Sequence, residues 1–407
     1  MGPLAGLKVL DLSRILAGPW ATQCLADYGA EVWKIERPGE GDDTRKWGPP
    51  WLSLPDGTAS AESAYYLSCN RGKHSLAIDL AHPEGQALIR QLALQADVLV
   101  ENFKLDGLKK YGLDHASLTA AAPRLIYCSI TGFGHTGPRR EQAGYDAMIQ
   151  AQGGIMSITG EADDLPGAGP QKIGVAAADL MCGMYAVSAI LAALHARERS
   201  GQGQVIDLAL FDTQLAWLAN QAMNYLVGGT VPQRLGTAHP NIVPYQVFAV
   251  RDGHMMLAVG NDRQFRDFCA VAGQPELAQD ARFATNQARV RHRAELLPLL
   301  AHSLQQDSLD TWLARLAQAQ VPCGPINTID RAFADPQSIA RDVRFELPHA
   351  LGVEVPQVRN PVRFSGTPVC YDRAPPLLGA DTSEVLTRVL GVSADELADL
   401  RAARAIG

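Results

Sequence analysis

The residue with the clearest potential for chemistry is Asp179, which stands at the start of a long apolar stretch of the sequence. In the first turn of a helix its carboxylate would be stabilised in the ionised form, because the helix macrodipole favours negative charge there. An ionised carboxylate can act as a nucleophile and form a covalent acyl intermediate. The same position also suits an ordinary helix cap. The residue pattern alone leaves both interpretations open.

Most familiar catalytic and cofactor motifs are missing from the sequence, including the phosphate-binding GxxxxGK[ST] loop, the GxSxG elbow and the HExxH helix. Gly132-Phe133-Gly134 follows a predicted strand, but the next residues do not complete a dinucleotide-binding fingerprint. The ten histidines lack the spacing of metal ligands, and the seven cysteines include no CxxC pair. We therefore expect no metal, no NAD or flavin, and no disulfide framework.

Charge and composition exclude several classes of protein. The 407 residues include 36 Lys and Arg against 43 Asp and Glu, a net charge of -7 that argues against nucleic-acid binding. The most apolar run, Leu180 to Leu194, is too short to span a bilayer, and the N-terminus begins with a strand-like run instead of a secretory leader. We expect a cytoplasmic protein that binds neither nucleic acid nor membrane.

The elements that must position Asp179 alternate between strand and helix. Apolar strands are predicted at 7–12, 31–35, 75–80, 98–100, 125–130 and 204–210, and helices at 18–28, 83–94, 180–199 and 211–226. This alternation, with continuously apolar strands, predicts an α/β fold with a doubly wound sheet.

A Pro- and Gly-containing segment, 230–245, predicts a linker. Two strands around Arg251-Asp252-Gly253 then predict a hairpin, and helical patterns follow at 262–272, 292–306 and 308–319. We divide the chain into the first part of a large domain (1–227), a linker with a small α+β domain (228–325), and a return segment that completes the large domain (326–407).

Several segments of the sequence are distinctive. The first is LKVLDLSRILAGPWATQCLADYGAEVWKIERPGEGDDTR, residues 7–45. The others include CNRGKHSLAIDL, LVENF, GYDAMIQAQGG, VPCGPINTI and the block from Val175 to Thr213. Together they resemble the family III CoA-transferases, and the first segment is the most specific match. Within the family, GDDTRKWGPP and RLGTAHPNIVPYQVF are similar to members of the succinyl-CoA:glutarate type. The resemblance implies a Rossmann-like large domain.

The resemblance also implies that Asp179 is the catalytic residue. Its carboxylate would attack an acyl-CoA, expel CoA thiolate and form an aspartyl anhydride. The thiolate would then attack the aspartyl carbonyl, giving an aspartyl-CoA thioester that a second carboxylic acid converts back. Two alternatives stay open: an acyl-CoA racemase or epimerase, and an unrelated nucleotide-binding oxidoreductase. Gly144-Tyr145-Asp146 replaces the Gly-His-Asp of the racemase, and tyrosine is a poor base at neutral pH, which favours transfer.

Positions that match the family's CoA contacts follow the early strands or line the active site. They are Leu16, Ala17, Arg37, Arg71, Lys73, Ile78, Asp79, Asn102, Phe103, Lys110, Tyr145 and Asp146. A dicarboxylate substrate needs a cation or donor for its distal carboxylate, and the candidates are Arg14, Arg45 and His239. Gly260 and Asn261 match the family's mobile glycine loop.

The family forms interlocked dimers, so the resemblance implies a homodimer. Each active site would lie between the large domain of one protomer and the small domain of its partner.

Overall fold

The computed structural model describes residues 1–407, which form two compact units. Unit 1 contains residues 1–155, 172–226 and 339–407, and unit 2 contains residues 156–171 and 227–338. The first predicted boundary, 227/228, lies within one residue of the observed one. Two predicted assignments differ from the structure: residues 156–171 belong to unit 2, and the chain returns to unit 1 at 339 instead of 326.

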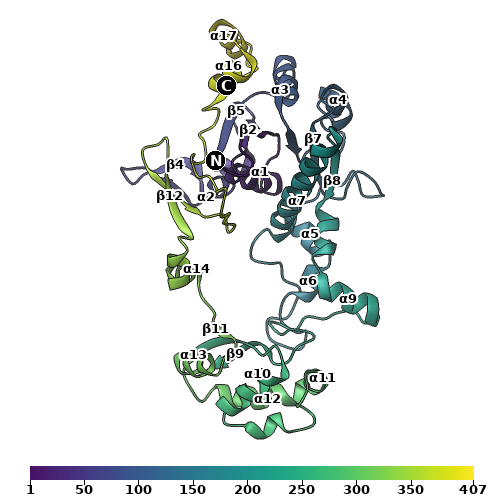
Figure 1. Ribbon diagram of the computed structural model, residues 1–407, viewed down its shortest axis with the longest axis vertical. Helices are drawn as coiled ribbons and strands as arrows, with labels where there is room; N and C mark the ends of the chain where they lie inside the picture. The colour runs from purple at the N-terminus through teal and green to yellow at the C-terminus, as the bar shows by residue number, and fades with distance from the viewer. The chain divides into compact units, whose positions relative to one another are not determined.

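Unit 1 is built on a six-stranded sheet in which every neighbouring pair is parallel (Figure 1). The strand order is β5-β2-β1-β6-β7-β8. The strands are β1 (Lys8–Asp11), β2 (Glu31–Glu36), β5 (Lys73–Ala77), β6 (Val98–Glu101), β7 (Ile126–Thr131) and β8 (Val205–Ala209). The chain starts at the centre, runs outward to β5 and then continues on the other side of β1, which is the doubly wound order. The predicted α/β class with a parallel sheet is confirmed.

Helices cover both faces of this sheet. One apolar core joins the sheet to α1 (Ala17–Asp27), α5 (Asp146–Gln152), α7 (Ala177–Ser200) and α8 (Leu210–Ala216). A second core joins it to α3 (Pro83–Gln95), α4 (His115–Ala121), α16 (Thr382–Leu390) and α17 (Ala394–Ala402). The remaining elements of unit 1 are η1 (Asp43–Lys46), β3 (Trp51–Ser53), β4 (Ala59–Ser63), α2 (Ala64–Leu67), η2 (Lys109–Tyr111), β12 (Arg344–Pro348) and β13 (Glu354–Val358).

The C-terminal segment closes the outer edge of the sheet. Asp381 accepts a hydrogen bond from the Ser75 backbone N–H on β5 at 2.9 Å, and the Thr382 hydroxyl accepts one from the Ala77 N–H at 3.0 Å. An edge strand otherwise exposes unpaired backbone groups. Residues more than 300 positions apart in the chain therefore belong to one fold.

Helix α7 packs closely along α1 because it carries a glycine at the contact. A Cβ on Gly183 would lie 2.7 Å from the Ala17 carbonyl oxygen and 3.2 Å from the Trp20 ring. By length and composition α7 is the one helix that could cross a membrane, although we expected its apolar run to be too short. Half of its most apolar window is buried against the rest of the protein, which assigns α7 to the core of unit 1.

Unit 2 has its own sheet and its own core. Its antiparallel sheet has the order β11-β10-β9, and the predicted hairpin is β9 (Tyr245–Val250) with β10 (Gly253–Ala258). The other elements are α6 (Ile155–Ile158), α10 (Asp262–Val271), η3 (Pro275–Ala278), α11 (Asn286–Arg291), α12 (Arg293–Leu304), α13 (Leu309–Gln318), β11 (Cys323–Pro325), α14 (Ile329–Ala334) and α15 (Pro336–Ala340).

One predicted helix of the chain is two helices in the structure. The pattern at 211–226 predicts a single helix, but α8 ends at Ala216 and α9 (Ala219–Gly228) starts after a break. Ala219 has a φ of 47°, in the left-handed region that a continuous helix cannot use. The apolar periodicity runs through the break, so it could not reveal it.

A buried ionic cluster ties the central strands together. The ammonium group of Lys73 on β5 lies 3.1 Å from the Asp11 carboxylate on β1, and Lys34 on β2 lies 2.9 Å from Asp42. The side chains of all four residues are fully buried. Burial opposes ionisation of Asp11, but the charges of Lys73 and Lys34, together with hydrogen bonds from Ser13 and Thr22, lower its pKa. Lys73 was predicted to bind CoA; its ammonium is instead engaged inside the sheet by Asp11, Asn70 and the Pro19 carbonyl.

We predict that Asp11→Ala lowers the free energy of unfolding by about 3–5 kcal/mol, because it leaves buried lysine charge unpaired. Urea denaturation measures the change. Glu198→Ala, which removes an exposed carboxylate on α7, is the control and should change stability by less than about 0.5 kcal/mol. Equal effects of the two substitutions would contradict the role of the cluster.

Candidate active site

The centre of the sheet provides a natural place for a ligand. The strand order reverses between β1 and β6, and ligands of doubly wound folds bind where the loops after such strands separate. Here the two loops are joined by the Asn102 side chain. Its amide oxygen accepts a hydrogen bond from the Arg14 backbone N–H at 2.8 Å, and its amide nitrogen donates to the Arg14 carbonyl at 2.7 Å. Asn102 therefore fixes the backbone at the entrance to α1.

The next residue, Ile15, is held in a strained conformation. Its φ is 71°, which is rare for a β-branched side chain. Its backbone N–H donates to the two carboxylate oxygens of Asp42 at 3.3 and 3.2 Å. Burial opposes the charge on Asp42, but Lys34 and the Thr44 donors lower its pKa to about 2. These hydrogen bonds fix the loop after β1. Its left-handed residue could not be predicted from the sequence, because such a position is usually marked by glycine and here it is Ile15.

A cleft of about 690 Å³ opens at this point and brings together half of the predicted site residues. The predicted residues that line it are Arg14, Leu16, Ala17, Asn102, Phe103, Lys110, Tyr145, Asp146 and Asp179. A neighbouring cavity of about 390 Å³ is lined by Arg37, Ile78 and Asp79 and shares Arg14 and Phe103 with the cleft. The two spaces form a continuous surface from Asp179 to the end of β2.

Asp179 lies in the first turn of α7 and is half-buried. Burial raises the pKa of its carboxyl to about 7, with a further contribution from the negative charge of Asp146. We expected the helix N-terminus to keep this carboxylate ionised. The structure corrects that expectation, because the first-turn N–H groups are already engaged by Asp146. The Asp146 carboxylate accepts hydrogen bonds from the backbone N–H groups of Ala178 at 2.8 Å and Asp179 at 3.3 Å.

The Gly144-Tyr145-Asp146 motif is positioned by a contact between two glycines. A Cβ on Gly144 would lie 2.4 Å from the Gly132 Cα, and a Cβ on Gly132 would lie 2.6 Å from the Gly144 nitrogen. Only two glycines allow the loop after β7 to touch the start of α5 so closely. Tyr145 is exposed at the rim of the cleft, and Asp146 begins α5.

Tyr65 on α2 is a neighbour of Asp179 that sequence analysis missed. Burial, followed by the negative charge of Asp179, raises the pKa of its hydroxyl to about 12. The hydroxyl therefore remains a hydrogen-bond donor at neutral pH. No motif marks this position, because Tyr65 comes from a short helix remote in sequence from α7.

Two arginines predicted to bind ligands are buried in ion pairs instead. Arg45 donates to Glu36 at 2.8 Å and to Glu62 at 3.0 Å, and its guanidinium lies 3.7 Å from the centre of the Tyr66 ring. Arg71 forms two hydrogen bonds with Asp27, at 2.8 and 2.7 Å. These guanidinium groups hold the fold together and do not line the cleft.

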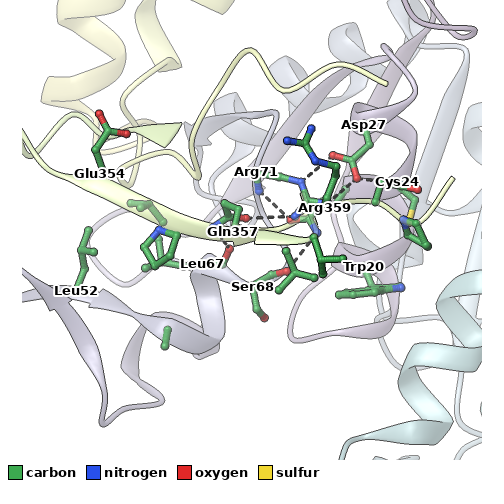
Figure 2. Close-up of a pocket in the computed structure, with 18 of the residues that line it drawn as sticks. Trp20, Cys24, Asp27, Leu52, Leu67, Ser68, Arg71, Glu354, Gln357 and Arg359 are labelled. Atoms are coloured by element: carbon green, nitrogen blue, oxygen red, sulfur yellow. Dashed lines mark hydrogen bonds and ion pairs between the residues drawn. The ribbon is translucent and has the colours of Figure 1, made fainter. Parts of the chain in front are cut away.

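Arg71 also contributes to the floor of a larger cavity, of about 920 Å³, which does not contain Asp179. Figure 2 shows Arg71 between Asp27 on α1 and Gln357 on β13, joined by hydrogen bonds. Gln357 also donates to the Leu67 carbonyl at 3.2 Å. The polar side chains on the floor of this cavity therefore form hydrogen bonds within the protein itself.

The remaining predicted residues belong to unit 2 and are held by local contacts. The His239 ring accepts the Asn241 N–H at 3.0 Å and packs against Tyr245. Burial and the Arg293 charge lower its pKa. Asn261 caps α10 by accepting the Gln264 N–H at 2.9 Å, and the Gly260 N–H donates to the Gln264 side chain at 2.8 Å.

One group of side chains could offer ligands to a metal, namely His74, Asp381 and Glu384. It lies outside the cleft, and arginines already neutralise both carboxylates: Arg373 lies 2.7 Å from Asp381, and Arg388 lies 2.6 Å from Glu384.

The chain is similar to known proteins over nearly its whole length. Residues 4–382 match the sequence profile described as CoA-transferase family III. The chain is 52% identical to a succinate–glutarate CoA-transferase of Agrobacterium fabrum, over 95% of this chain and 96% of the relative. It is 42% identical to the human succinyl-CoA:glutarate CoA-transferase, over 95% of this chain and 86% of the relative. The crystal structure of a CaiB/BaiF family protein from Brucella suis, 52% identical, superposes with a TM-score of 0.83 over 95% of this chain and 99% of that chain.

We predict that Asp179→Asn stabilises the protein above pH 7. The unfolded carboxyl loses its proton near pH 4, whereas the folded one retains it to about pH 7, so ionisation penalises only the native protein as pH rises between these values. Asparagine cannot ionise. The unfolding free energy of the variant should exceed that of the parent by about 1–4 kcal/mol at pH 8 and equal it near pH 4. Chemical denaturation across this pH range measures the difference, and a pH-independent difference would contradict the raised pKa.

Proposed function

The chain belongs to CoA-transferase family III, and from that premise we propose that it moves CoA from succinyl-CoA to a dicarboxylic acid such as glutarate. The observation that carries the proposal is a partly buried carboxyl, that of Asp179, in a cleft at the switch point of the sheet. Burial raises its pKa to about 7. The named activities of the two relatives support the choice of substrates.

In this proposal the Asp179 carboxylate attacks the thioester carbonyl of succinyl-CoA and expels CoA thiolate, which leaves a succinyl-aspartyl anhydride. The thiolate attacks the aspartyl carbonyl, so that succinate leaves and CoA is held as a thioester on Asp179. The carboxylate of glutarate then attacks this thioester and the sequence runs in reverse to give glutaryl-CoA. Covalent catalysis thus divides one exchange into reversible steps.

The environment of Asp179 favours acylation. Its anion is destabilised by burial and by the charge of Asp146, whereas the anhydride and the thioester are uncharged. Converting the anion into either intermediate therefore removes an unfavourable charge interaction. The raised pKa also makes the carboxylate more basic, and a more basic carboxylate is a stronger nucleophile. We propose that Tyr65 donates its hydroxyl to the developing oxyanions, since the charge of Asp179 acts on this side chain.

The CoA moiety would extend from the cleft into the neighbouring cavity. Lys110 and Arg37 provide exposed cations for its phosphates, and Asn102 and Phe103 line the path between them. Leu16 and Ala17 present backbone at the start of α1. Of the cations predicted for the distal carboxylate of the substrate, Arg14 lines the cleft, and we assign it this role.

We further propose that the protein acts as an interlocked homodimer in the cytoplasm. Helix α9 supports association: it contains no buried residue, and its side chains Met223, Tyr225 and Leu226 are exposed. An apolar helix face with no partner in its own chain is typical of an interface. In such a dimer His239, Gly260 and Asn261 would reach the cleft from the partner protomer.

We predict that Asp179→Ala lowers kcat by at least about 1,000-fold, since it removes the nucleophile. The parent, incubated with succinyl-CoA and no acceptor, should yield a peptide containing Asp179 with covalently bound CoA in mass spectrometry. The Glu198→Ala protein is the control and should yield the same adduct. An Asp179→Ala enzyme that transfers CoA as fast as the parent would refute the mechanism. Deuterium uptake at the α-carbon of the acyl group without any acceptor acid would identify a racemase instead.

Lys110→Ala should raise the KM for succinyl-CoA roughly 10-fold with kcat changed less than about twofold, because a charge-assisted phosphate contact is lost. Lys110→Arg should retain most of the affinity. Lys109→Ala removes the adjacent exposed lysine, which does not line the cleft, and should leave KM unchanged. Equal effects at the two lysines would contradict a specific phosphate contact.

A further inference from the structure

We propose that Asp146 is a positioning residue, not a CoA ligand: it fixes the first turn of α7 and, through its negative charge, sets the protonation of Asp179. The inference rests on the proposed function for its catalytic meaning, but its structural part can be tested without catalysis.

The hydrogen bonds of Asp146 place its charge at the start of α7. One carboxylate oxygen accepts the backbone N–H groups of Ala178 and Asp179, at 2.8 and 3.3 Å. The N-cap residue of the helix, Ala176, has no side chain able to do this. Asp146 therefore supplies, from α5, the cap that the sequence of α7 does not contain.

The second carboxylate oxygen is held by Gln150, one turn later on α5. The Gln150 amide nitrogen donates to it at 2.7 Å, and the Gln150 amide oxygen accepts the Ile173 N–H at 2.9 Å. Gln150 is fully buried. Three donors thus engage Asp146, and Gln150 joins it to the segment that leads into α7. A carboxylate engaged in this way offers little to a CoA phosphate, which would also be repelled by its charge.

The charged and titratable groups around Asp179 come from several elements. The negative charge beside it is that of Asp146 on α5. Further along α7, burial raises the pKa of the Cys182 thiol to about 12, so this thiol is uncharged at neutral pH. The charge of Asp179 also contributes to the raised pKa of Tyr65 on α2. Other titratable residues lie on elements packed against α7: Cys24 and Asp27 on α1, Cys128 on β7, Asp207 on β8 and Asp212 on α8. The cations that line other walls of the cleft are Arg14, Lys104, Lys110 and Arg140. The cleft wall also carries the carboxylates of Asp106 and Glu141. Burial, followed by the charge of Asp146, raises the pKa of Asp179.

This arrangement separates the tasks of two neighbouring carboxylates. Asp146 accepts the backbone N–H groups of α7, and Asp179, whose pKa burial raises to about 7, is the one that holds a proton up to neutral pH. Acylation of Asp179 by the donor thioester removes its charge and with it the repulsion. Replacing Asp146 by a neutral side chain should therefore lower the basicity of Asp179 and move its ionisation to lower pH.

The first test uses stability. Two differences in unfolding free energy are measured from pH 4 to 9. The first is between Asp179→Asn and the parent. The second is between the double variant Asp146→Asn/Asp179→Asn and the single variant Asp146→Asn. Ionisation of Asp179 appears as a rise in each difference with pH. In the proteins that carry Asp146→Asn, we expect this rise to be complete at a pH that is lower by at least about one unit. A rise at the same pH in both backgrounds overturns the proposal.

The second test uses the full reaction with succinyl-CoA and glutarate. In Asp146→Asn the acid limb of the kcat profile should move to lower pH by about one unit, while the Kd of CoA changes less than about threefold. A large loss of CoA affinity with an unmoved acid limb overturns the proposal and makes Asp146 a CoA ligand. If the parent does not transfer CoA at all, the proposed function fails, and the stability measurement still decides the role of Asp146.

Matched variants keep both tests interpretable. Glu198→Gln removes a carboxylate from the far end of α7 and should leave the pH profiles unmoved. If Asp146→Asn does not fold, Asp146→Ser replaces it, since a serine hydroxyl retains an oxygen acceptor for the helix N–H groups without the charge.

Discussion

The carboxylates of Asp146 and Asp179 both lie at the N-terminus of helix α7. The site depends on the fact that Asp146 accepts the backbone N–H groups of this helix. Asp146 accepts the free N–H groups of α7, and Asp179 is left beside it, partly buried and without them. The repulsion between the two carboxylates raises the pKa of Asp179, and it is absent whenever Asp179 holds its proton. The elements around the site hold these side chains in place: the glycine contact that brings α5 to β7, the Gln150 bridge, and the close approach of α1 to α7 at Gly183.

The switch point of the sheet supplies the rest of the cleft. The loop after β1 is clamped by Asn102 from the β6 side and by Asp42 from the β2 side, with Ile15 strained between them. Asp42 is in turn charged because Lys34 is buried against it. A buried ionic cluster inside the sheet thus stabilises the loop on which the ligand would rest. Such a cluster contributes little net stability compared with apolar packing, but it defines one geometry for the loop.

Much of this could be predicted from the sequence. The alternation of apolar strands and helices was sufficient for the parallel sheet, and the resemblance located Asp179 and eight other residues that line the cleft. The cations were less predictable. Lys73, Arg45 and Arg71 look like ligand-binding residues in a sequence, but buried carboxylates remote in the chain engage them. No sequence pattern assigned a role to Tyr65, Ile15 or the buried Gln150, although the spacing of Asp146 and Gln150 by one helical turn was a usable signal. The sequence also suggested an ionised Asp179, since a helix N-terminus is visible in a sequence and a competing carboxylate from another helix is not.

The central claim is that Asp179 carries CoA covalently, and oxygen transfer tests it most directly. Glutarate labelled with ¹⁸O in its carboxylates is incubated with succinyl-CoA and the enzyme for a single turnover, and the peptide containing Asp179 is analysed by mass spectrometry. When glutarate attacks the aspartyl thioester, its oxygen becomes the bridge of the anhydride, and it stays on Asp179 when CoA departs with the glutaryl group. The account predicts ¹⁸O in the Asp179 carboxylate and, after further turnovers, in released succinate. Glutaryl-CoA formed without any ¹⁸O in Asp179 would contradict it.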